Sequence, residues 1–378
     1  MKRGWIALVT VLVTVMLLAF FMLGGLAQDP EGFRDGELKA PLVTTIVRDG
    51  TLPEPLGAID FPAHLETGIS YTQVYQDYGG IIELLIDNKG SNQVYVRSYG
   101  LSWGSENITC SVNCSKFVSS GETLSMGVLY FTGPGTNGTS TFSVHMNLWA
   151  SSIHGDQWSD KGDLLVGTQE VECLPEPELR DRDVSRNPVK QYNKLNELVD
   201  FEAVGGLMEN VLEVVPGDYS VGQVLEAYEL VRAKFPYLVD TDDHWQSVSE
   251  TLALGTGDCE DHAILLSSLL TALGGHCRIN LINGHAFPTV YVGNSTSKLT
   301  EVTENIRTYY GNAVPVHWIE DDLGYWLVVD TVGMPYAGGH PAASVPVEVS
   351  GGGSWNFQDG DWIMTIDVTG ETVPGIVI

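Results

Sequence analysis

A change of pattern divides this sequence in two near residues 173–188, "CLPEPELRDRDVSRNP". Before it, residues 44–172 read as short strands separated by turn residues, with no amphipathic helix between them. In "STFSVHMNLW", apolar and polar residues alternate from Phe142 to Leu148, the period of a half-buried strand. This pattern predicts an immunoglobulin-like β-sandwich at residues 36–175. The proline and charge of the following stretch predict a linker at residues 176–195.

Beyond residue 195 the pattern favours helices first and strands afterwards. "SVGQVLEAYELVRAKF" begins with a serine cap and has helical apolar spacing, and a further helix is expected from about Asp258 to Leu273. "CRINLING", "HAFPTVYVG", "AVPVHWIE" and "YWLVVDTV" then read as successive strands. Helices followed by strands indicate an α+β domain, which is expected at residues 196–378.

The N-terminus carries an uncharged stretch, residues 4–28, directly after Lys2 and Arg3. Its length is sufficient for a helix to cross a bilayer, so we expect a transmembrane signal-anchor at residues 1–28, with the remaining chain extracytoplasmic. "GGLAQD" leaves cleavage as an alternative. An acid-rich cell-surface protein with a single anchor suits an archaeal origin. The expectation of a glycoprotein rests on four glycosylation sequons: Asn107, Asn113, Asn137 and Asn294.

Charge and cysteine content narrow the function further. The chain of 378 residues has 19 basic and 48 acidic side chains, a formal net charge of -29, which disfavours nucleic-acid partners. An odd number of cysteines outside the membrane leaves at least one thiol unpaired. Three of them lie in the first half, where Cys110 and Cys114 could pair with each other or either could pair with Cys173.

Cys259 lies in "GTGDCEDHA", at the start of the apolar helix. Asp258 can cap this helix, and Asp261 can complete a capping-box-like pair. A cysteine in the first turn faces the positive end of the peptide dipoles, which favours thiolate over thiol. The free amides of the same turn can bind a developing oxyanion. We therefore predict that Cys259 is a nucleophile.

A thiol nucleophile needs a base and a group that orients the base. His285 begins the strand "HAFPTVYVG", and Asp330 follows the apolar run "YWLVV". Neighbouring strands would bring both to the helix start. His262 lies on the helix itself, which favours a packing role. Asp321 and Asp322 are the alternatives to Asp330, but we expect both in a solvated loop.

The order Cys259, His285, Asp330, in "GDCEDHA", "GHAFPTVYV" and "YWLVVDTV", resembles the transglutaminase-like core of the papain-like superfamily. The stretch from Asp242 to Gly275 is similar to bacterial transglutaminase-like cysteine proteinases, which are periplasmic and calcium-dependent. The resemblance covers roughly residues 237–332. It implies a nucleophile, a general base and its orienting carboxylate, in that order.

The resemblance also implies a metal site and a reaction. By analogy with calcium-dependent relatives, Asp258, Glu260 and Asp261 match ion-binding positions, although the chemistry itself requires no cofactor. Trp245 or Gln246 could add an oxyanion donor. The expected activity is attack on a protein or peptide amide through a thioester, with hydrolysis favoured over amine transfer. The alternative is a catalytically inactive binding or structural module on the cell surface.

Overall fold

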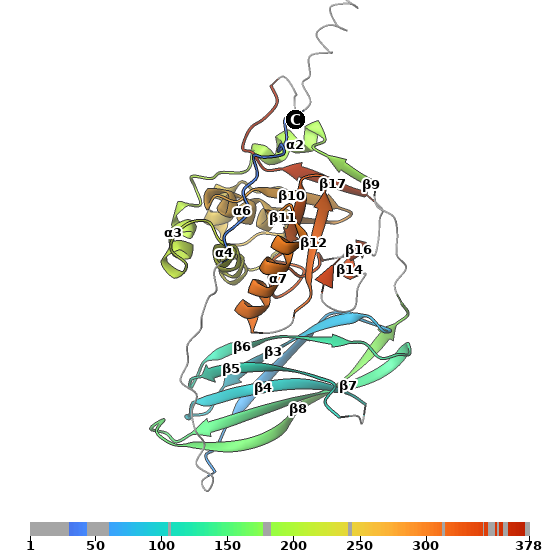
Figure 1. The fold of residues 1–378 in the computed structure, drawn as a ribbon. Helices are drawn as coiled ribbons and strands as arrows, with labels where there is room; N and C mark the ends of the chain where they lie inside the picture. The colour runs from blue at the N-terminus through green and yellow to red at the C-terminus, as the bar shows by residue number, and fades with distance from the viewer. Residues whose placement is uncertain are drawn as a thin grey trace, which may run out of the picture.

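The computed structural model describes residues 30–43, 60–104, 107–176, 183–240, 244–311, 314–342, 344–346, 352–353, 355–357 and 362–374. Its first domain is a sandwich of two β-sheets (Figure 1). One sheet has the strand order β1-β3-β6 and the other has the order β2-β8-β7-β4-β5. The strands are β1 (Leu65–Tyr71), β2 (Val74–Tyr75), β3 (Gly79–Asn88), β4 (Val94–Trp103), β5 (Cys110–Val118), β6 (Thr123–Thr132), β7 (Gly138–Ser151) and β8 (Trp158–Leu174).

Alternating apolar side chains form the core of the sandwich. On β7, Phe142, Val144, Met146 and Leu148 are buried, while the residues between them are half-exposed. They pack into one cluster with side chains from β3, β4 and β6. The period-two pattern thus places its apolar face between the two sheets.

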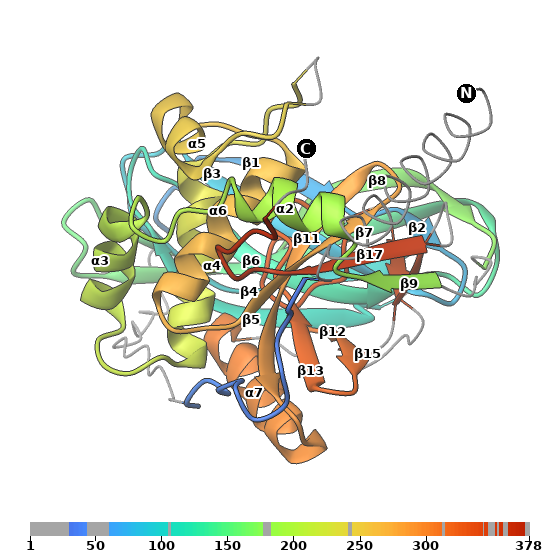
Figure 2. The same cartoon turned by 90° about the horizontal axis from the view of Figure 1, so that it is seen from above.

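The second domain is built on a sheet with the order β15-β12-β13-β11-β10-β17-β9. Helix α6 packs against β10 and β11, and α4 packs against α6 (Figure 2). The helices are α2 (Val189–Asn196), α3 (Gly205–Val214), α4 (Val221–Lys234), α5 (Val248–Leu254), α6 (Cys259–Ala272) and α7 (Thr296–Tyr310). The strands are β9 (Asp183–Arg186), β10 (Cys277–Ile282), β11 (His285–Gly293), β12 (Val316–Asp321), β13 (Gly324–Val328), β14 (Ser344–Pro346), β15 (Gly352–Gly353), β16 (Trp355–Phe357) and β17 (Trp362–Asp367).

Two segments that lie before the expected start of the second domain at residue 196 belong to it. Within the expected linker, β9 pairs in parallel with β17, and α2 contacts β17 as well. Residues 30–43 also lie against this domain, where the backbone amide of Phe33 donates to Asp367 Oδ2 at 3.0 Å. Asp367 is fully buried and also accepts a hydrogen bond from Arg278 Nε at 2.7 Å. This carboxylate therefore joins three distant parts of the chain.

The fold class expected from the sequence needs one correction. Among the residues that the structure describes, no helix is long and apolar enough to span a bilayer. The stretch read as a transmembrane signal-anchor, residues 1–28, lies outside the described ranges. The described residues therefore form a β-sandwich followed by an α+β domain, and the expected transmembrane helix is not among them.

The cysteines form no disulfide. All five lie among the described residues, and each is a free thiol. Cys110 and Cys114 are half-buried on β5, and burial raises the pKa of the Cys114 thiol to about 12. The pairing considered for Cys110, Cys114 and Cys173 is therefore absent from this structure.

Candidate functional site

The start of α6 is held by its own acidic residues. Asp261 accepts hydrogen bonds from the backbone amides of Asp258, at 3.2 Å, and Gln246, at 2.7 Å. These amides lie at the helix N-terminus and before α5, so one carboxylate ties the two helices together. Gly257 permits this arrangement, because a Cβ there would lie 2.6 Å from the Asp261 Cβ.

Cys259 occupies the first position of this helix, and its thiol has a close acidic partner. The sulfur donates to Glu260 Oε2 at 3.0 Å. Burial raises the pKa of the Cys259 thiol, and the Glu260 carboxylate raises it further, while a hydrogen bond from the backbone of Ala286 acts in the opposite direction. The helix N-terminus was expected to lower this pKa. The adjacent carboxylate and the burial outweigh that effect.

His285 and Asp330 form a buried pair at 2.7 Å between Nε2 and Oδ2. β11 begins at His285 and pairs with β13, and Asp330 follows the end of β13. The structure thus brings the two residues together across neighbouring strands, as the sequence order predicted. Asp330 also accepts hydrogen bonds from the backbone amides of Ala342, at 2.9 Å, and Val332, at 3.0 Å.

The electrostatics of this pair favour an ion pair. Burial opposes charge on both side chains, but their mutual attraction outweighs it. The pKa of His285 is therefore raised, and the pKa of Asp330 is lowered. Since Nε2 is engaged by Asp330, the other ring nitrogen, Nδ1, is the one left for proton transfer.

Cys259 and His285 line one cavity of about 460 Å³. Ala286, next to His285, lines the same cavity, and α6 packs against β11, so the helix start and the strand start meet at this point. The cavity has an apolar rim on which Tyr237 and Val239 are exposed. Its other lining residues include three acids and two tryptophans: Asp240, Asp258, Glu260, Trp245 and Trp362.

The remaining sequence-predicted residues occupy other positions. His262 is buried and contacts the Thr331 hydroxyl at 3.0 Å through Nδ1. Asp321 is paired with Arg278 at 2.6 Å, and Asp322 is exposed, so neither is the partner of His285. The four sequon asparagines, Asn107, Asn113, Asn137 and Asn294, are exposed.

The two expected oxyanion donors differ in position. Trp245 lines the cavity, and Lys194 Nζ lies 3.6 Å above its ring. Gln246 is buried, and its backbone amide is already bonded to Asp261. Of the two, only Trp245 lines the cavity of Cys259 and His285.

The acidic residues around Cys259 fit calcium poorly. Asp258, Cys259 and Glu260 place their ligand atoms within 4.8 Å of one another, but calcium takes six to eight oxygen ligands, and sulfur is too soft for it. Asp261, expected to complete the set, already accepts from two backbone amides. Asp261 instead caps the start of α6, and Glu260 accepts the hydrogen bond of the Cys259 thiol.

Two contacts were not foreseen from the sequence. Tyr228 on α4 bonds the backbone oxygen of Asp330 at 3.2 Å, and Ala342 bonds its carboxylate. Tyr228 and Asp330 are 102 residues apart in the chain, and Ala342 and Asp330 are 12 residues apart. No local sequence pattern indicates contacts between such segments. A third contact, the hydrogen bond from the Cys259 thiol to the Glu260 carboxylate, has no signal in the sequence either.

The chain was compared with known families and structures. Residues 210–331 match the family model described as "Transglutaminase-like superfamily". No curated protein matches the chain.

Similar solved structures share little sequence with it. A proposed cysteine protease from Cytophaga hutchinsonii is 12% identical, with 62% of this chain and 74% of that chain covered and a TM-score of 0.23. The proposed ApaA protein from Bordetella pertussis is 16% identical, with 30% of this chain and 95% of that chain covered and a TM-score of 0.22. Similarities at this level carry no argument about this chain.

Proposed function

We propose that the protein is a thiol enzyme acting on amide bonds of proteins or peptides, because residues 210–331 match the transglutaminase-like family model. Cys259 is the nucleophile, His285 the general base and Asp330 the group that orients the base. The observation that carries the proposal is the buried His285–Asp330 pair at 2.7 Å, because His285 lines the same cavity as Cys259.

The first half-reaction forms a thioester. His285 Nδ1 takes the proton of the Cys259 thiol, and the sulfur attacks the carbonyl carbon of the amide. Asp330 stabilises the imidazolium that results. The imidazolium then gives its proton to the nitrogen of the leaving amine, and the C–N bond breaks. The free amides of the first turn of α6, with Trp245 beside them, would stabilise the oxyanion.

The second half-reaction decides between hydrolysis and amine transfer. His285 removes a proton from water or from an amine, which attacks the thioester and releases the thiol. Hydrolysis is favoured because Cys259 is only half-buried and the cavity rim at Tyr237 and Val239 is exposed. Such a cavity admits water, whereas amine transfer requires that water be excluded.

The test is incubation of the full chain with a peptide library and a tagged primary amine, followed by mass spectrometry. Cleaved peptides indicate hydrolysis, and tagged peptides indicate transfer. Cys259→Ser and His285→Ala should abolish both products, while Cys277→Ser, a buried thiol outside the cavity, should abolish neither. Products that persist in Cys259→Ser would refute the assignment of the nucleophile.

One observation favours a second candidate, a binding module without catalysis. The Cys259 thiol donates to Glu260, and its pKa is raised, so it is protonated in this arrangement. Iodoacetamide labelling separates the two candidates. An enzyme should label quickly near neutral pH in a manner that His285→Ala abolishes, whereas a binding module should label only at high pH, with or without His285.

A further inference from the structure

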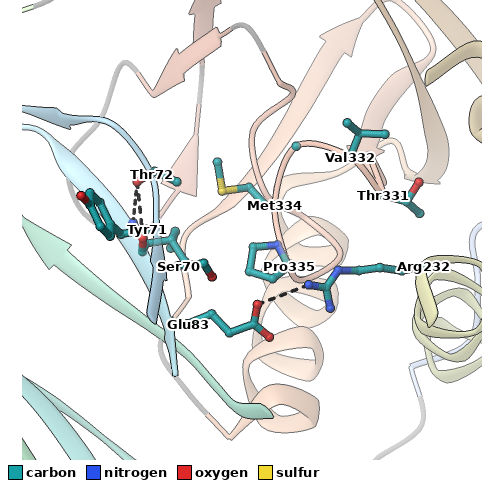
Figure 3. Close-up of a pocket in the computed structure, with 11 residues that line it drawn as sticks. Ser70, Tyr71, Thr72, Glu83, Arg232, Thr331, Val332, Met334 and Pro335 are labelled. Carbon is teal, nitrogen blue, oxygen red and sulfur yellow. Dashed lines mark hydrogen bonds and ion pairs between the residues drawn. The ribbon is translucent and has the colours of Figure 1, made fainter. Parts of the chain in front are cut away.

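A cavity of about 210 Å³ lies where the sandwich meets the second domain (Figure 3). The sandwich side is formed by β1 and β3, including Ser70 and Glu83. The opposite side is formed by Arg232 of α4 and by residues 331–335. Those five residues directly follow Asp330 in the chain. The junction between the domains therefore borders the segment that carries the proposed orienting carboxylate.

An ion pair crosses this junction. Glu83 Oε2 on β3 lies 3.4 Å from Arg232 Nη2 on α4 (Figure 3). The Glu83 side chain is 12% exposed and that of Arg232 is 33% exposed, so the pair is only partly screened by solvent. The hydroxyl of Ser125 donates to the second Glu83 oxygen at 2.6 Å. The carboxylate is thus held in place from within the sandwich.

Helix α4 transmits this contact to residues 331–335. Tyr228 lies one turn before Arg232, and its buried hydroxyl contacts the backbone oxygens of Asp330, at 3.2 Å, and Met334. Arg232 of α4 therefore meets the sandwich, and Tyr228 in the preceding turn contacts the backbone at Asp330 and at Met334. A shift of α4 would move Asp330.

Apolar packing supports the same segment from the sandwich side. Ile81 of β3 and Val128 of β6 belong to the same buried cluster as Met334 and Tyr336. Val332, between Asp330 and Met334, donates its backbone amide to Asp330 Oδ1 at 3.0 Å. The backbone that orients the carboxylate is therefore packed between the two domains.

We propose that the β-sandwich positions Asp330, and that Glu83 and Arg232 are the positioning residues through which it does so. The ion pair holds α4 and residues 331–335 in the arrangement in which Asp330 Oδ2 meets His285 Nε2. The sandwich is then a part of the active unit and not a spacer. The catalytic meaning of this contact rests on the function proposed above for Cys259, His285 and Asp330.

The test measures the pKa of His285 by NMR in the full chain labelled at histidine. In Glu83→Gln and in Arg232→Gln, we expect this pKa to fall by about half a unit, the scale of a partly exposed ion pair. In the double variant, the pKa of His285 should fall no further than in either single variant, because each single substitution already removes the whole interaction. The labelling rate of Cys259 against pH should shift in parallel.

Matched controls separate positioning from general destabilisation. Asp87→Asn lies on the same strand and removes an ion pair with the exposed Lys89, and Lys234→Gln changes an exposed residue of the same helix. Both should leave the pKa of His285 unchanged. Melting temperatures of all variants are measured alongside.

The proposal is overturned if Glu83→Gln and Arg232→Gln lower the melting temperature while the pKa of His285 stays at its wild-type value. It is also overturned if the controls shift that pKa as much as the test variants do. Failure of the proposed function gives a different result. In that case the wild-type protein produces neither cleaved nor tagged peptides, whether or not the pKa of His285 changes in Glu83→Gln.

Discussion

The thiol of Cys259 donates a hydrogen bond to the carboxylate of Glu260, its neighbour in the chain, at 3.0 Å. The same carboxylate lies beside Asp258, and burial raises the pKa of Glu260 to about 7, with Asp258 acting in the same direction. In this arrangement the sulfur keeps its proton. Transfer of that proton to His285 requires the thiol to turn from Glu260 toward the imidazole.

Glu260→Gln should make Cys259 more reactive. Removing the charge that raises the pKa of the thiol shifts the midpoint of its labelling by iodoacetamide to lower pH. Each unit of this shift raises the thiolate fraction about tenfold below the midpoint. Glu304→Gln, an exposed residue of α7, is the control. An unchanged midpoint in Glu260→Gln would show that the carboxylate does not control the thiol.

The His285–Asp330 pair should make stability depend on pH in two opposite directions. The raised pKa of His285 stabilises the fold below its unfolded pKa of about 6.5, and this is lost as the pH rises through the folded value. The lowered pKa of Asp330 stabilises the fold above about 3.9, and this is lost as the pH falls through the folded value. The pair therefore contributes most between about pH 4 and 6.5.

Urea unfolding of wild type and Asp330→Asn at several pH values measures this contribution. The difference in unfolding free energy should be larger at about pH 5 than at about pH 8.5. Asp322→Asn, at an exposed position, should show no such trend. Equal differences for Asp330→Asn at both pH values would contradict an ion pair in the folded protein.

Removal of calcium should leave the protein unchanged. Among the described residues, only Asp258 and Glu260 place carboxylate oxygens beside the Cys259 sulfur, and Asp261 serves the backbone amides of Asp258 and Gln246. Excess chelator, or excess calcium after dialysis, should therefore alter neither the melting temperature nor the labelling rate of Cys259. A rise of several degrees with calcium would show that Asp258 and Glu260 bind the ion after all.

Asp367→Asn should destabilise the second domain by about 3 kcal/mol, because it removes the buried carboxylate that Arg278 and Arg186 share and leaves Asp321 as the remaining acidic partner of Arg278. Asp367 is fully buried and accepts from Arg278, which is itself 2% exposed, and from Arg186 at 3.1 Å. The exposed Glu371→Gln on the same segment should cost little. Chemical denaturation compares them, and similar values for both variants would contradict the role of the carboxylate.

The sequence predicted those parts of the candidate site that depend on residue order and on local pattern. Capping residues and an apolar run locate the helix at Cys259, and apolar runs locate the strands before and after His285 and Asp330. Whether Asp330 or Asp321 faces His285 depends on strand register, which the alternation alone did not decide. The direction of the thiol toward Glu260 depends on a side-chain rotamer, for which the sequence has no signal.

Elements of the fold were missed for different reasons. Helix α7 lies between two segments that were expected to be successive strands, "HAFPTVYVG" and "AVPVHWIE", although Leu299, Val302, Ile306 and Tyr309 have helical spacing and are buried. The helical spacing of these four residues is a local signal that predicts α7. β9 is short and exposed, and it becomes a strand only by pairing with β17, about 180 residues later. Pairing over such a separation leaves no local trace.

The position of β17 has a consequence for dissecting this protein. β17 lies between β10 and β9 in the sheet, so a fragment limited to residues 210–331 would leave β10 with an open edge of unpaired amides and carbonyls. Such an edge invites pairing between molecules. An expression fragment of this domain should therefore start before β9 and run past Asp367, because the boundaries of the family match are not the boundaries of a folding unit.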